Sequence, residues 1–327
     1  MRYIGLDVGF GYTKAMDETK SIIFPSIMSP AVEITFRSGL EDPSSRLDHL
    51  NVALDGAAYF VGDLARRQGR FAYATLDRVR TQGQEYRLLF LTALALLAGG
   101  SYEECSVVTG LPVDDFEDRR LIEETLAGRF HLTVANQEVT LNIHHLTVVP
   151  QPCGAFMDLL FKDTRGNMDE QYADAQVGVI DIGFKTTDFV LIRKGEFIQK
   201  LSGSLKKGMS LVYQAAVPKF TARYPGNWDL HLVEAALQEG SITSLGKRIE
   251  VDSMHLLPDL AGLAKEIAAW IYGRWSSERI DFLVCSGGGS LLLDPHLRKV
   301  FPQMIFIGHP QEANVRGFYK GAWYYDG

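Results

Sequence analysis

Cysteine is scarce in this sequence. The three cysteines, Cys105, Cys153 and Cys285, are far apart in a chain of 327 residues. They form no CxxC or cysteine–histidine spacing, which argues against a zinc finger or an iron–sulfur cluster. A small, odd number of cysteines is typical of proteins from a reducing compartment. We therefore expect a cytoplasmic protein.

Long hydrophobic runs and an excess of positive charge are also missing. The most apolar stretch, residues 88–98, is too short to span a bilayer at about 1.5 Å per residue, and it predicts a buried helix ending at Gly99. The start of the chain has no apolar segment of signal-peptide length. The 33 basic and 40 acidic residues give a formal charge of −7. We therefore expect no membrane contact and no direct binding of nucleic acid.

What is present is an ordinary globular composition, with 46% hydrophobic and 22% charged residues. The length predicts two domains or one two-lobed unit. Residues 33–60 are expected to be rich in loops. Strands and helices alternate elsewhere, which predicts the α/β class. Strands are expected at residues 3–8, 106–112, 146–150, 177–183, 188–192, 196–201 and 280–285, and helices at 85–98, 154–161, 209–217, 229–238, 259–275 and 315–323.

One short pattern occurs twice. Residues 7–14 (DVGFGYTK) are similar to residues 181–188 (DIGFKTTD), which begin 174 positions later, and both follow an apolar strand. A repeat at this distance indicates two related halves rather than a solenoid, whose period would be shorter.

Each copy can bind an anion, because glycine turns let backbone N–H groups approach a phosphate closely. Lys14 adds a positive charge, and the hydroxyl groups of Thr186 and Thr187 can donate hydrogen bonds. Asp7 and Asp181 suit a hydrated magnesium ion held between the halves. The alternative is that each copy is an ordinary β-turn. The presence of two copies half a chain apart argues against this alternative. The spacing matches neither the P-loop nor the Rossmann pattern.

A third element is the run of Gly287, Gly288 and Gly289 after an apolar strand. Consecutive glycines before a helix allow a close approach to a flat base and its ribose. A flexible turn is the alternative interpretation.

Taken in order, these motifs resemble the actin-like ATPase superfamily, which includes actin, heat-shock chaperones and sugar kinases. Residues 7–14 resemble its first phosphate motif, residues 181–188 its second, and residues 284–290 its adenosine motif. Residues 109–112 with 151–155, and residues 314–322, fall where its two connecting regions lie. Within the superfamily, residues 4–14 are most similar to plasmid-segregation actins of the ParM/StbA type and to compact archaeal actin-like proteins.

The resemblance implies an actin-like fold of two duplicated α/β lobes around a nucleotide cleft. Lobe I is expected at residues 1–155, with the C-terminal helix at 313–327 returning to it, and lobe II at 156–312. The implied cofactors are ATP, with GTP as an alternative, and Mg²⁺ bound by Asp7 and Asp181 through water. Gln151, Asp181 and Asp7 are the expected catalytic residues. The expected nucleotide-binding residues are Gly9, Phe10, Gly11, Tyr12, Thr13, Lys14, Gly183, Phe184, Lys185, Thr186, Thr187, Gly208, Gly287, Gly288 and Gly289.

Gln151 matches the actin glutamine that positions the attacking water. Asp188 stands where actin has a histidine, and plasmid actins share this difference, so the residue that activates water is left open. The function implied is an ATP-dependent filament that drives plasmid or DNA segregation through an adaptor protein and disassembles after hydrolysis. Two alternatives are a small-molecule kinase of the sugar type and a nucleotide-sensing scaffold that hydrolyses weakly.

Overall fold

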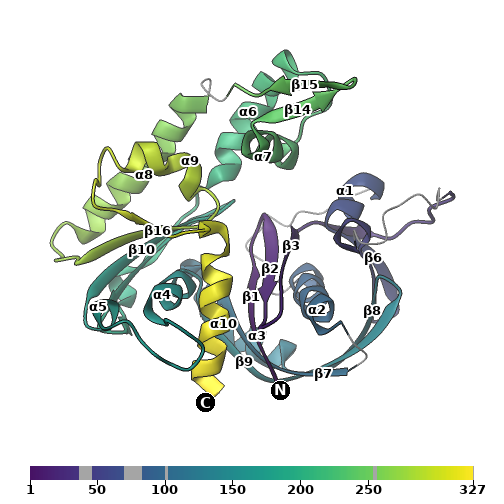
Figure 1. Ribbon diagram of the computed structural model, residues 1–327, viewed down its shortest axis with the longest axis horizontal. Helices are drawn as coiled ribbons and strands as arrows, with labels where there is room; N and C mark the ends of the chain where they lie inside the picture. The colour runs from purple at the N-terminus through teal and green to yellow at the C-terminus, as the bar shows by residue number, and fades with distance from the viewer. Residues whose placement is uncertain (37–45, 70–82, 100–101, 253–255, 327) are drawn as a thin grey trace.

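The computed structural model describes the chain except for residues 37–45, 70–82, 100–101, 253–255 and 327. Two β-sheets with their helices lie next to one another (Figure 1). We call the part built on the sheet of β1 to β9 the first lobe, and the part built on β10 to β17 the second lobe. The α/β class and the two-lobed architecture are as predicted.

The first lobe contains a nine-stranded sheet in the order β3-β2-β1-β7-β9-β8-β5-β6-β4. β1 runs antiparallel to β2 and parallel to β7, and β7 runs parallel to β9. The strands are β1 (Arg2–Val8), β2 (Tyr12–Met16), β3 (Ser21–Pro25), β4 (Met28–Pro30), β5 (Asn51–Leu54), β6 (Ala57–Val61), β7 (Tyr102–Leu111), β8 (Gly128–Val134) and β9 (Gln137–Pro150).

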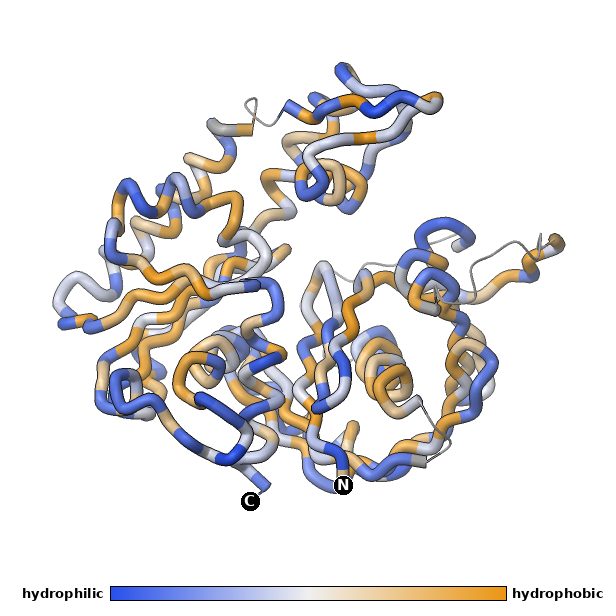
Figure 2. Tube along the Cα trace, in the orientation of Figure 1, coloured by the Kyte–Doolittle hydropathy of each residue, from blue (hydrophilic) through white to orange (hydrophobic). Residues whose placement is uncertain are grey.

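This sheet curls around one buried helix, α2 (Gln84–Ala98), which appears in hydrophobic colours inside the curl (Figure 2). The helix ends at Gly99, whose φ of 61° is the left-handed conformation common after a helix C-terminus. Both features were predicted. The loop-rich prediction for residues 33–60 was wrong in part, because β5 and β6 form a hairpin over residues 51–61. Residues 37–45 of the predicted range lie outside the described residues. The other helices are α1 (Asp63–Gln68) and α3 (Arg119–Leu126), preceded by a 3₁₀ helix at Val113–Asp118.

The second lobe contains a six-stranded sheet in which β12, β11, β10, β16 and β17 lie in that order and β13 pairs with β11. Its strands are β10 (Gln176–Ile182), β11 (Thr187–Arg193), β12 (Glu196–Phe197), β13 (Gly203–Leu205), β16 (Phe282–Ser286) and β17 (Ile305–Phe306). β10 runs antiparallel to β11 and parallel to β16, as β1 does to β2 and β7. The strand expected over residues 196–201 is shorter than predicted, because Gln199–Leu201 forms a 3₁₀ turn.

The helices of the second lobe cover this sheet and build an upper part with a small hairpin, β14 (Ser241–Ser244) and β15 (Lys247–Glu250). They are α5 (Glu170–Ala173), α6 (Met209–Arg223), α7 (Leu230–Glu239), α8 (Leu257–Trp275) and α9 (Ser290–Leu297). Each predicted helix of this region is found. Among the described residues, no helix is both long and apolar enough to cross a membrane.

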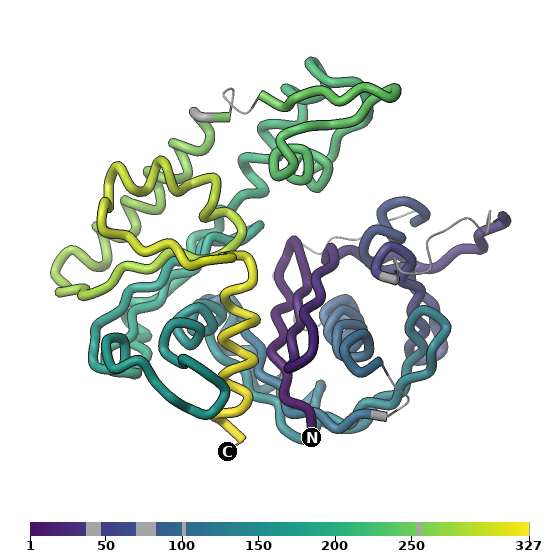
Figure 3. The backbone as a smooth tube through the Cα atoms, viewed as in Figure 1, coloured from purple at the N-terminus to yellow at the C-terminus, as the bar shows by residue number. Residues whose placement is uncertain are grey.

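Two helices lie between the sheets, α4 (Pro152–Leu160) and α10 (Ala313–Asp326). The tube view shows α10 ending near the N-terminus, so the last helix returns toward the beginning of the chain (Figure 3). The two helices pack closely, because a Cβ atom on Gly317 would lie 1.8 Å from the carbonyl oxygen of Gly154. The expected lobe boundary at residues 155 and 156 falls inside α4 and stays a prediction.

Candidate functional site

The two copies of the sequence repeat form two equivalent strand–turn–strand hairpins, β1–β2 and β10–β11. In the first turn the N–H of Gly9 donates to the carbonyl of Tyr12 at 3.1 Å. In the second, the N–H of Gly183 donates to the carbonyl of Thr186 at 2.9 Å. Each pair of residues is separated from its counterpart by the 174 positions of the repeat. The internal similarity therefore reflects a shared backbone geometry.

These hairpins face each other across a cleft. A Cβ atom on Gly11 would lie 3.0 Å from the side chain of Phe184, so the two turns approach closely where the first one carries glycine. Asp7 and Asp181 are both buried near the ends of strands whose carboxyl ends meet here. The acids of the two lobes are thus brought into one pocket, although they lie 174 positions apart in the sequence.

The pocket is lined by both hairpins, by the glycine run and by the starts of α4, α6 and α10, and it encloses about 60 Å³. Fourteen of the predicted residues line it: Asp7, Gly9, Phe10, Gly11, Tyr12, Lys14, Gln151, Asp181, Gly183, Phe184, Thr186, Gly287, Gly288 and Gly289. The structure therefore brings together most of the residues that the motifs selected.

Asp7 holds the first half of the site in place. Its Oδ2 accepts a hydrogen bond from Lys14 Nζ at 2.9 Å, and its Oδ1 accepts one from Gln151 Nε2 at 2.8 Å. Lys14 is the cross-strand neighbour of Asp7 in the β1–β2 pair, and Gln151 precedes α4. A phosphate oxygen that binds Lys14 would therefore meet the carboxylate and the amide at the same place.

Asp181 occupies the equivalent position on β10 but has different partners. Its Oδ2 accepts a hydrogen bond from Asn314 Nδ2 at 2.7 Å, and its cross-strand neighbour is Asp188 rather than a lysine. Burial raises the pKa of Asp181 to about 7, the Asn314 hydrogen bond opposes this rise, and the charge of Asp7 adds to it. A bound cation would relieve this unfavourable charge.

The glycine run is shaped by its contact with β10. Gly287 has a φ of +84°, and a Cβ atom there would lie 2.3 Å from Asp181 Oδ1. A Cβ atom on Gly289 would lie 2.5 Å from Met209 Cγ, whereas one on Gly288 would have 3.6 Å to its nearest neighbour, Gln311. Two of the three glycines are thus required by packing within the protein, whereas a Cβ atom on Gly288 would make only ordinary van der Waals contact with Gln311.

Four predicted nucleotide-binding residues lie outside the pocket lining. The hydroxyl of Thr13 is buried against Ser26 at 2.8 Å, and that of Thr187 donates to the carbonyl of Lys207 at 2.9 Å. Lys185 Nζ lies 4.8 Å from the centre of the Phe10 ring. Gly208 packs against the backbone of residues 183–185. In Thr13 and Thr187 the alternation of a strand directs the side chain away from the cleft.

Several residues of the pocket were not selected as site residues from the sequence. They are Asp188, Met209, Glu234, Gln311 and Asn314. Asp188 was noted only for its departure from actin. It is buried and accepts hydrogen bonds from Thr186 Oγ1 at 2.7 Å and from the N–H of Val113 in the first lobe at 3.0 Å. Burial raises its pKa. The position at the end of the repeat was the signal that could have identified it.

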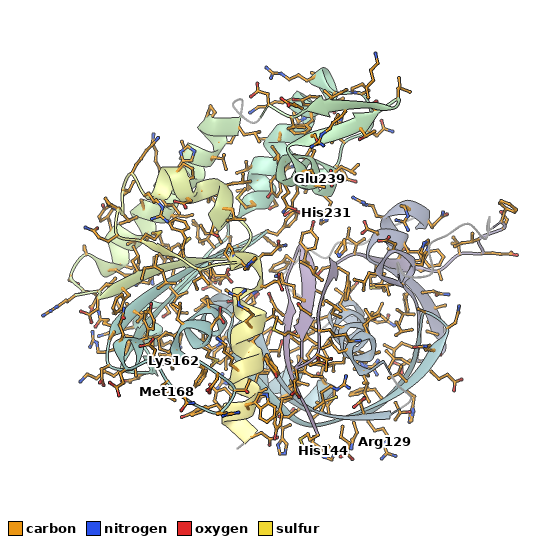
Figure 4. The ribbon with its side chains drawn as sticks, in the orientation of Figure 1. Arg129, His144, Lys162, Met168, His231 and Glu239 are labelled. Atoms are coloured by element: carbon orange, nitrogen blue, oxygen red, sulfur yellow. The ribbon has the colours of Figure 1, made fainter. Side chains whose placement is uncertain are left out.

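Glu234 on α7 is the least expected of these residues. It is buried, and the phenol groups of Tyr12 and Tyr213 hydrogen-bond to its carboxylate. Burial nevertheless raises its pKa to about 7. Its neighbour His231, labelled beside α7 in Figure 4, is stacked on Phe184 with ring centroids 5.2 Å apart. These contacts connect α7 with the hairpins of both lobes. A glutamate in an otherwise amphipathic helix carries no local signal of this role.

Comparisons with known proteins agree with this arrangement. Residues 5–154 match the family model of the actin-like protein N-terminal domain, and residues 179–299 match that of the archaeal actin homologue MreB-like C-terminal domain. No curated protein matches the sequence.

Solved structures match over nearly the whole chain. The archaeal actin homologue Ta0583 is 26% identical, covers 100% of both chains and has a TM-score of 0.79. A 15-stranded ParM filament from Clostridium botulinum is 25% identical over 98% of both chains, with a TM-score of 0.78. A non-polymerisable quadruple mutant of pCBH ParM is 26% identical over 98% of both chains, with a TM-score of 0.74. With both halves matched by models of actin-like proteins and the repeated hairpins facing one cleft, this chain belongs to the actin-like superfamily.

Proposed function

We propose that this protein is a filament-forming ATPase that binds a magnesium nucleotide between its lobes and positions DNA, such as a low-copy plasmid, through an adaptor protein. The observation that supports this most directly is the meeting of Asp7, Lys14, Gln151 and Asp181 in one pocket between two equivalent hairpins. Nucleotide binding is supported by a related structure, since Ta0583 has been solved in complex with ADP. Assembly into filaments is supported by the similarity to the ParM filament from Clostridium botulinum.

In this proposal the first hairpin holds the phosphates. The charge of Lys14 stabilises phosphate oxygens, and the glycine turn at residues 9–11 lets them approach the backbone closely, while the N–H of Gly9 closes the turn by donating to Tyr12. On nucleotide binding, the ammonium group of Lys14 would contact a phosphate oxygen in addition to Asp7, so its ion pair with Asp7 would weaken. The glycine run, in particular Gly288, would lie against the nucleoside.

The acids fit a hydrated magnesium ion. Asp181 is buried with a pKa raised to about 7 and forms no ion pair among the described residues, so a divalent cation would compensate its charge. When bound, magnesium would neutralise charge on the phosphate oxygens. Gln151 would then orient the attacking water, and Asp7 would hold Gln151 through the 2.8 Å hydrogen bond. Positioning of this kind is a large contribution in phosphoryl transfer.

The nucleotide would also control the arrangement of the lobes. A pocket of about 60 Å³ is far smaller than the several hundred ångströms cubed of a typical small-molecule site, so binding requires the lobes to separate. We propose that residues 1–155 with 313–327, and residues 156–312, move as the two units. A nucleotide that favours one arrangement would favour assembly if that arrangement fits the filament.

The test is right-angle light scattering of the purified protein with magnesium and ATP, followed by electron microscopy of the same sample. We expect scattering to rise and filaments to appear, and scattering to fall as phosphate is released. The control is the same protein with ATP and excess chelator. ATP binding without scattering over a wide range of protein concentration would contradict the proposal. Phosphate transfer to a sugar would then support the small-molecule kinase. ATP binding with negligible ATP hydrolysis would support the nucleotide-sensing scaffold.

A further inference from the structure

The segment of residues 111–114, where β7 ends, is hydrogen-bonded to Gln151 on one side and to the second lobe on the other. The carbonyl of Leu111 accepts a hydrogen bond from the backbone N–H of Gln151 at 2.7 Å. The N–H of Val113 donates to Asp188 Oδ1, in the second lobe, at 3.0 Å. The carboxylate of Asp188 is thus connected to Gln151 through the backbone of this short segment.

A second set of hydrogen bonds closes the same contact between the lobes. The N–H of Asp114 donates to Ser204 Oγ, and the N–H of Ser204 on β13 donates back to Asp114 Oδ1, both at 3.1 Å. Ser204 Oγ in turn donates to Oδ1 of Asp188, its partner in the β11–β13 register. We call the hydrogen bonds among Val113, Asp114, Asp188 and Ser204 the lobe clasp.

The segment has little freedom to move independently of Gln151. A Cβ atom on Gly110 would lie 2.9 Å from Gln151 Cα, so the chain just before the segment packs directly on the backbone of the glutamine. Pro112 has a φ of −49°, and its ring restricts rotation about this bond. A displacement of Val113 with the second lobe is therefore transmitted to Gln151 rather than absorbed between them.

The carboxylate of Asp188 is largely occupied by donors. Oδ1 accepts from Val113 and from Ser204, and Oδ2 accepts from Thr186 Oγ1 at 2.7 Å. A carboxylate offers about four lone-pair positions, so most of them are in use. Burial raises the pKa of Asp188, but these hydrogen bonds stabilise the charged form and oppose the rise. The group is therefore better suited to holding the backbone of the first lobe than to taking a proton from water.

We propose that Asp188 is a positioning residue for hydrolysis: through the lobe clasp and the segment of residues 111–114 it fixes Gln151 at the place where the attacking water is oriented. The inference rests on the proposed function, in which Gln151 orients that water. Asp188 and Ser204 belong to the second lobe, whereas the segment belongs to the first. A rotation of the lobes that opens the clasp releases Gln151 without removing the nucleotide, so hydrolysis requires the clasped arrangement.

Two substitutions of Asp188 separate positioning from proton transfer. Asp188→Asn keeps an oxygen for Val113 and Ser204 and places an amide group against Thr186 Oγ1, so the clasp persists although the charge is lost. We expect kcat for ATP hydrolysis to fall about threefold in Asp188→Asn and about 10- to 100-fold in Asp188→Ala, the size of loss that a displaced catalytic group causes. The KM for magnesium ATP should stay within about twofold in both variants, because the effect falls on the chemical step.

Ser204 allows the clasp to be opened from outside the pocket, because it is not among the residues that line the pocket. Ser204→Ala removes the hydroxyl group that links Asp114 to Asp188, and we expect kcat to fall about five- to tenfold at an unchanged KM. Ser204→Thr keeps the hydroxyl group and is the matched control, which should recover most of kcat.

A double-mutant cycle tests whether Asp188 acts through Gln151. In a Gln151→Ala background, Asp188→Ala should cause no further loss of kcat, because the effects of residues that act as a unit are not additive. Phosphate release at saturating magnesium ATP measures kcat, light scattering of the same samples reports assembly separately, and melting temperatures check that each variant is folded.

Three results would overturn the inference and leave the proposed function in place. The first is a loss in Asp188→Asn as large as in Asp188→Ala, which would show that the carboxylate itself acts on water or on a metal ion. The second is a wild-type kcat in Ser204→Ala, and the third is an undiminished effect of Asp188→Ala in the Gln151→Ala background. A wild-type protein that binds ATP but never hydrolyses it would overturn the proposed function and this inference with it.

Discussion

The hairpins β1–β2 and β10–β11 have the same backbone but different charges. In the first, Asp7 faces Lys14 across the strand pair and forms a 2.9 Å ion pair with it. In the second, Asp181 faces Asp188 at the equivalent position. Burial then raises the pKa of both Asp181 and Asp188. The repeat therefore supplies one geometry that carries a cation on one side of the cleft and carboxylates on the other.

This difference indicates a division of labour. A lysine beside a glycine turn is suited to phosphate oxygens, whereas buried carboxylates that form no ion pair within the described part of the chain are suited to a metal ion. The second hairpin is also tied to the first lobe, because Asp188 accepts a hydrogen bond from the N–H of Val113. The two copies share this scaffold, and the lysine or aspartate at the last position of the repeat, Lys14 or Asp188, separates their charges.

The largest effect is expected when the two acids are changed in turn. Asp7→Asn and Asp181→Asn should each lower magnesium-dependent ATP hydrolysis by about 100-fold or more. Their effects on stability should have opposite signs. Asp7→Asn removes the ion pair of Lys14, whereas Asp181→Asn removes a buried carboxylate that burial destabilises.

Phosphate release measures the first effect, and thermal unfolding without nucleotide measures the second. Glu239→Gln, at an exposed position on α7, is the matched control and should change neither. If Asp181→Asn kept the turnover of the wild type, Asp181 would have no role in hydrolysis. If both variants lost stability equally, the proposed difference between the hairpins would be wrong.

A smaller effect is expected at the turn that holds Asp181. Gly287→Ala adds a Cβ atom 2.3 Å from Asp181 Oδ1 at a φ of +84°, so the free energy of unfolding should fall by about 2–4 kcal/mol and nucleotide binding should weaken. Gly288→Ala is the control for stability, because its Cβ atom would make an ordinary 3.6 Å contact with Gln311, whereas its nucleotide binding should also weaken. Denaturant titration and nucleotide titration measure the two quantities. Equal losses of unfolding free energy in both variants would show that the run is merely a flexible turn.

The smallest effect concerns the contact between α7 and the first hairpin. The pKa of Glu234 is about 7 in the folded protein against an ordinary 4.5, with Tyr12, Tyr213, His231 and Lys14 as its titratable or charged neighbours. Between pH 4.5 and pH 7 the Glu234 carboxyl group is more fully protonated in the folded protein than in the unfolded chain. Its contribution to the free energy of unfolding is therefore fully present below about pH 4.5 and is lost as the pH rises toward 7.

Glu234→Gln removes the titrating carboxyl group and with it the loss of stability at higher pH. The variant should gain about 1–2 kcal/mol over the wild type at pH 8, and less at pH 5, because one pKa step corresponds to about 1.4 kcal/mol. Melting temperatures of both proteins between pH 5 and pH 8 measure the difference. A difference that is constant over this range would show that the carboxylate is not the cause.

Much of the fold could be predicted because the relevant signals are local. Apolar runs that alternate with glycine turns predicted β1 and β10, the continuous apolar run before Gly99 predicted α2, and the apolar spacing predicted α8. The loop-rich prediction for residues 33–60 was wrong in part, since short strands such as β5 and β6 depend on pairing with β8 and with each other. Most of the pocket lining was predicted from the motifs, because backbone turns need particular residues at particular positions.

The remaining site residues could not be predicted by the same means. Glu234 and Asn314 lie on helices, and their positions in the pocket depend on how α7 and α10 dock. Thr13 and Thr187 belong to the motifs, but the face of the strand on which each lies turns its hydroxyl away from the cleft. A motif defines a backbone path, whereas the direction of a side chain follows from the strand register.

The sequence by itself determined the α/β class, the two glycine hairpins and the acids that follow their strands, because these depend on short-range steric and hydrophobic patterns. Only the tertiary structure decided that Asp7 and Asp181 meet, that Asp181 forms no ion pair within the described part of the chain and that Leu245 stands exposed at a hairpin tip. These properties depend on the packing of segments distant in sequence, which sets burial, and burial in turn sets both the charge state of an acid and the exposure of an apolar side chain.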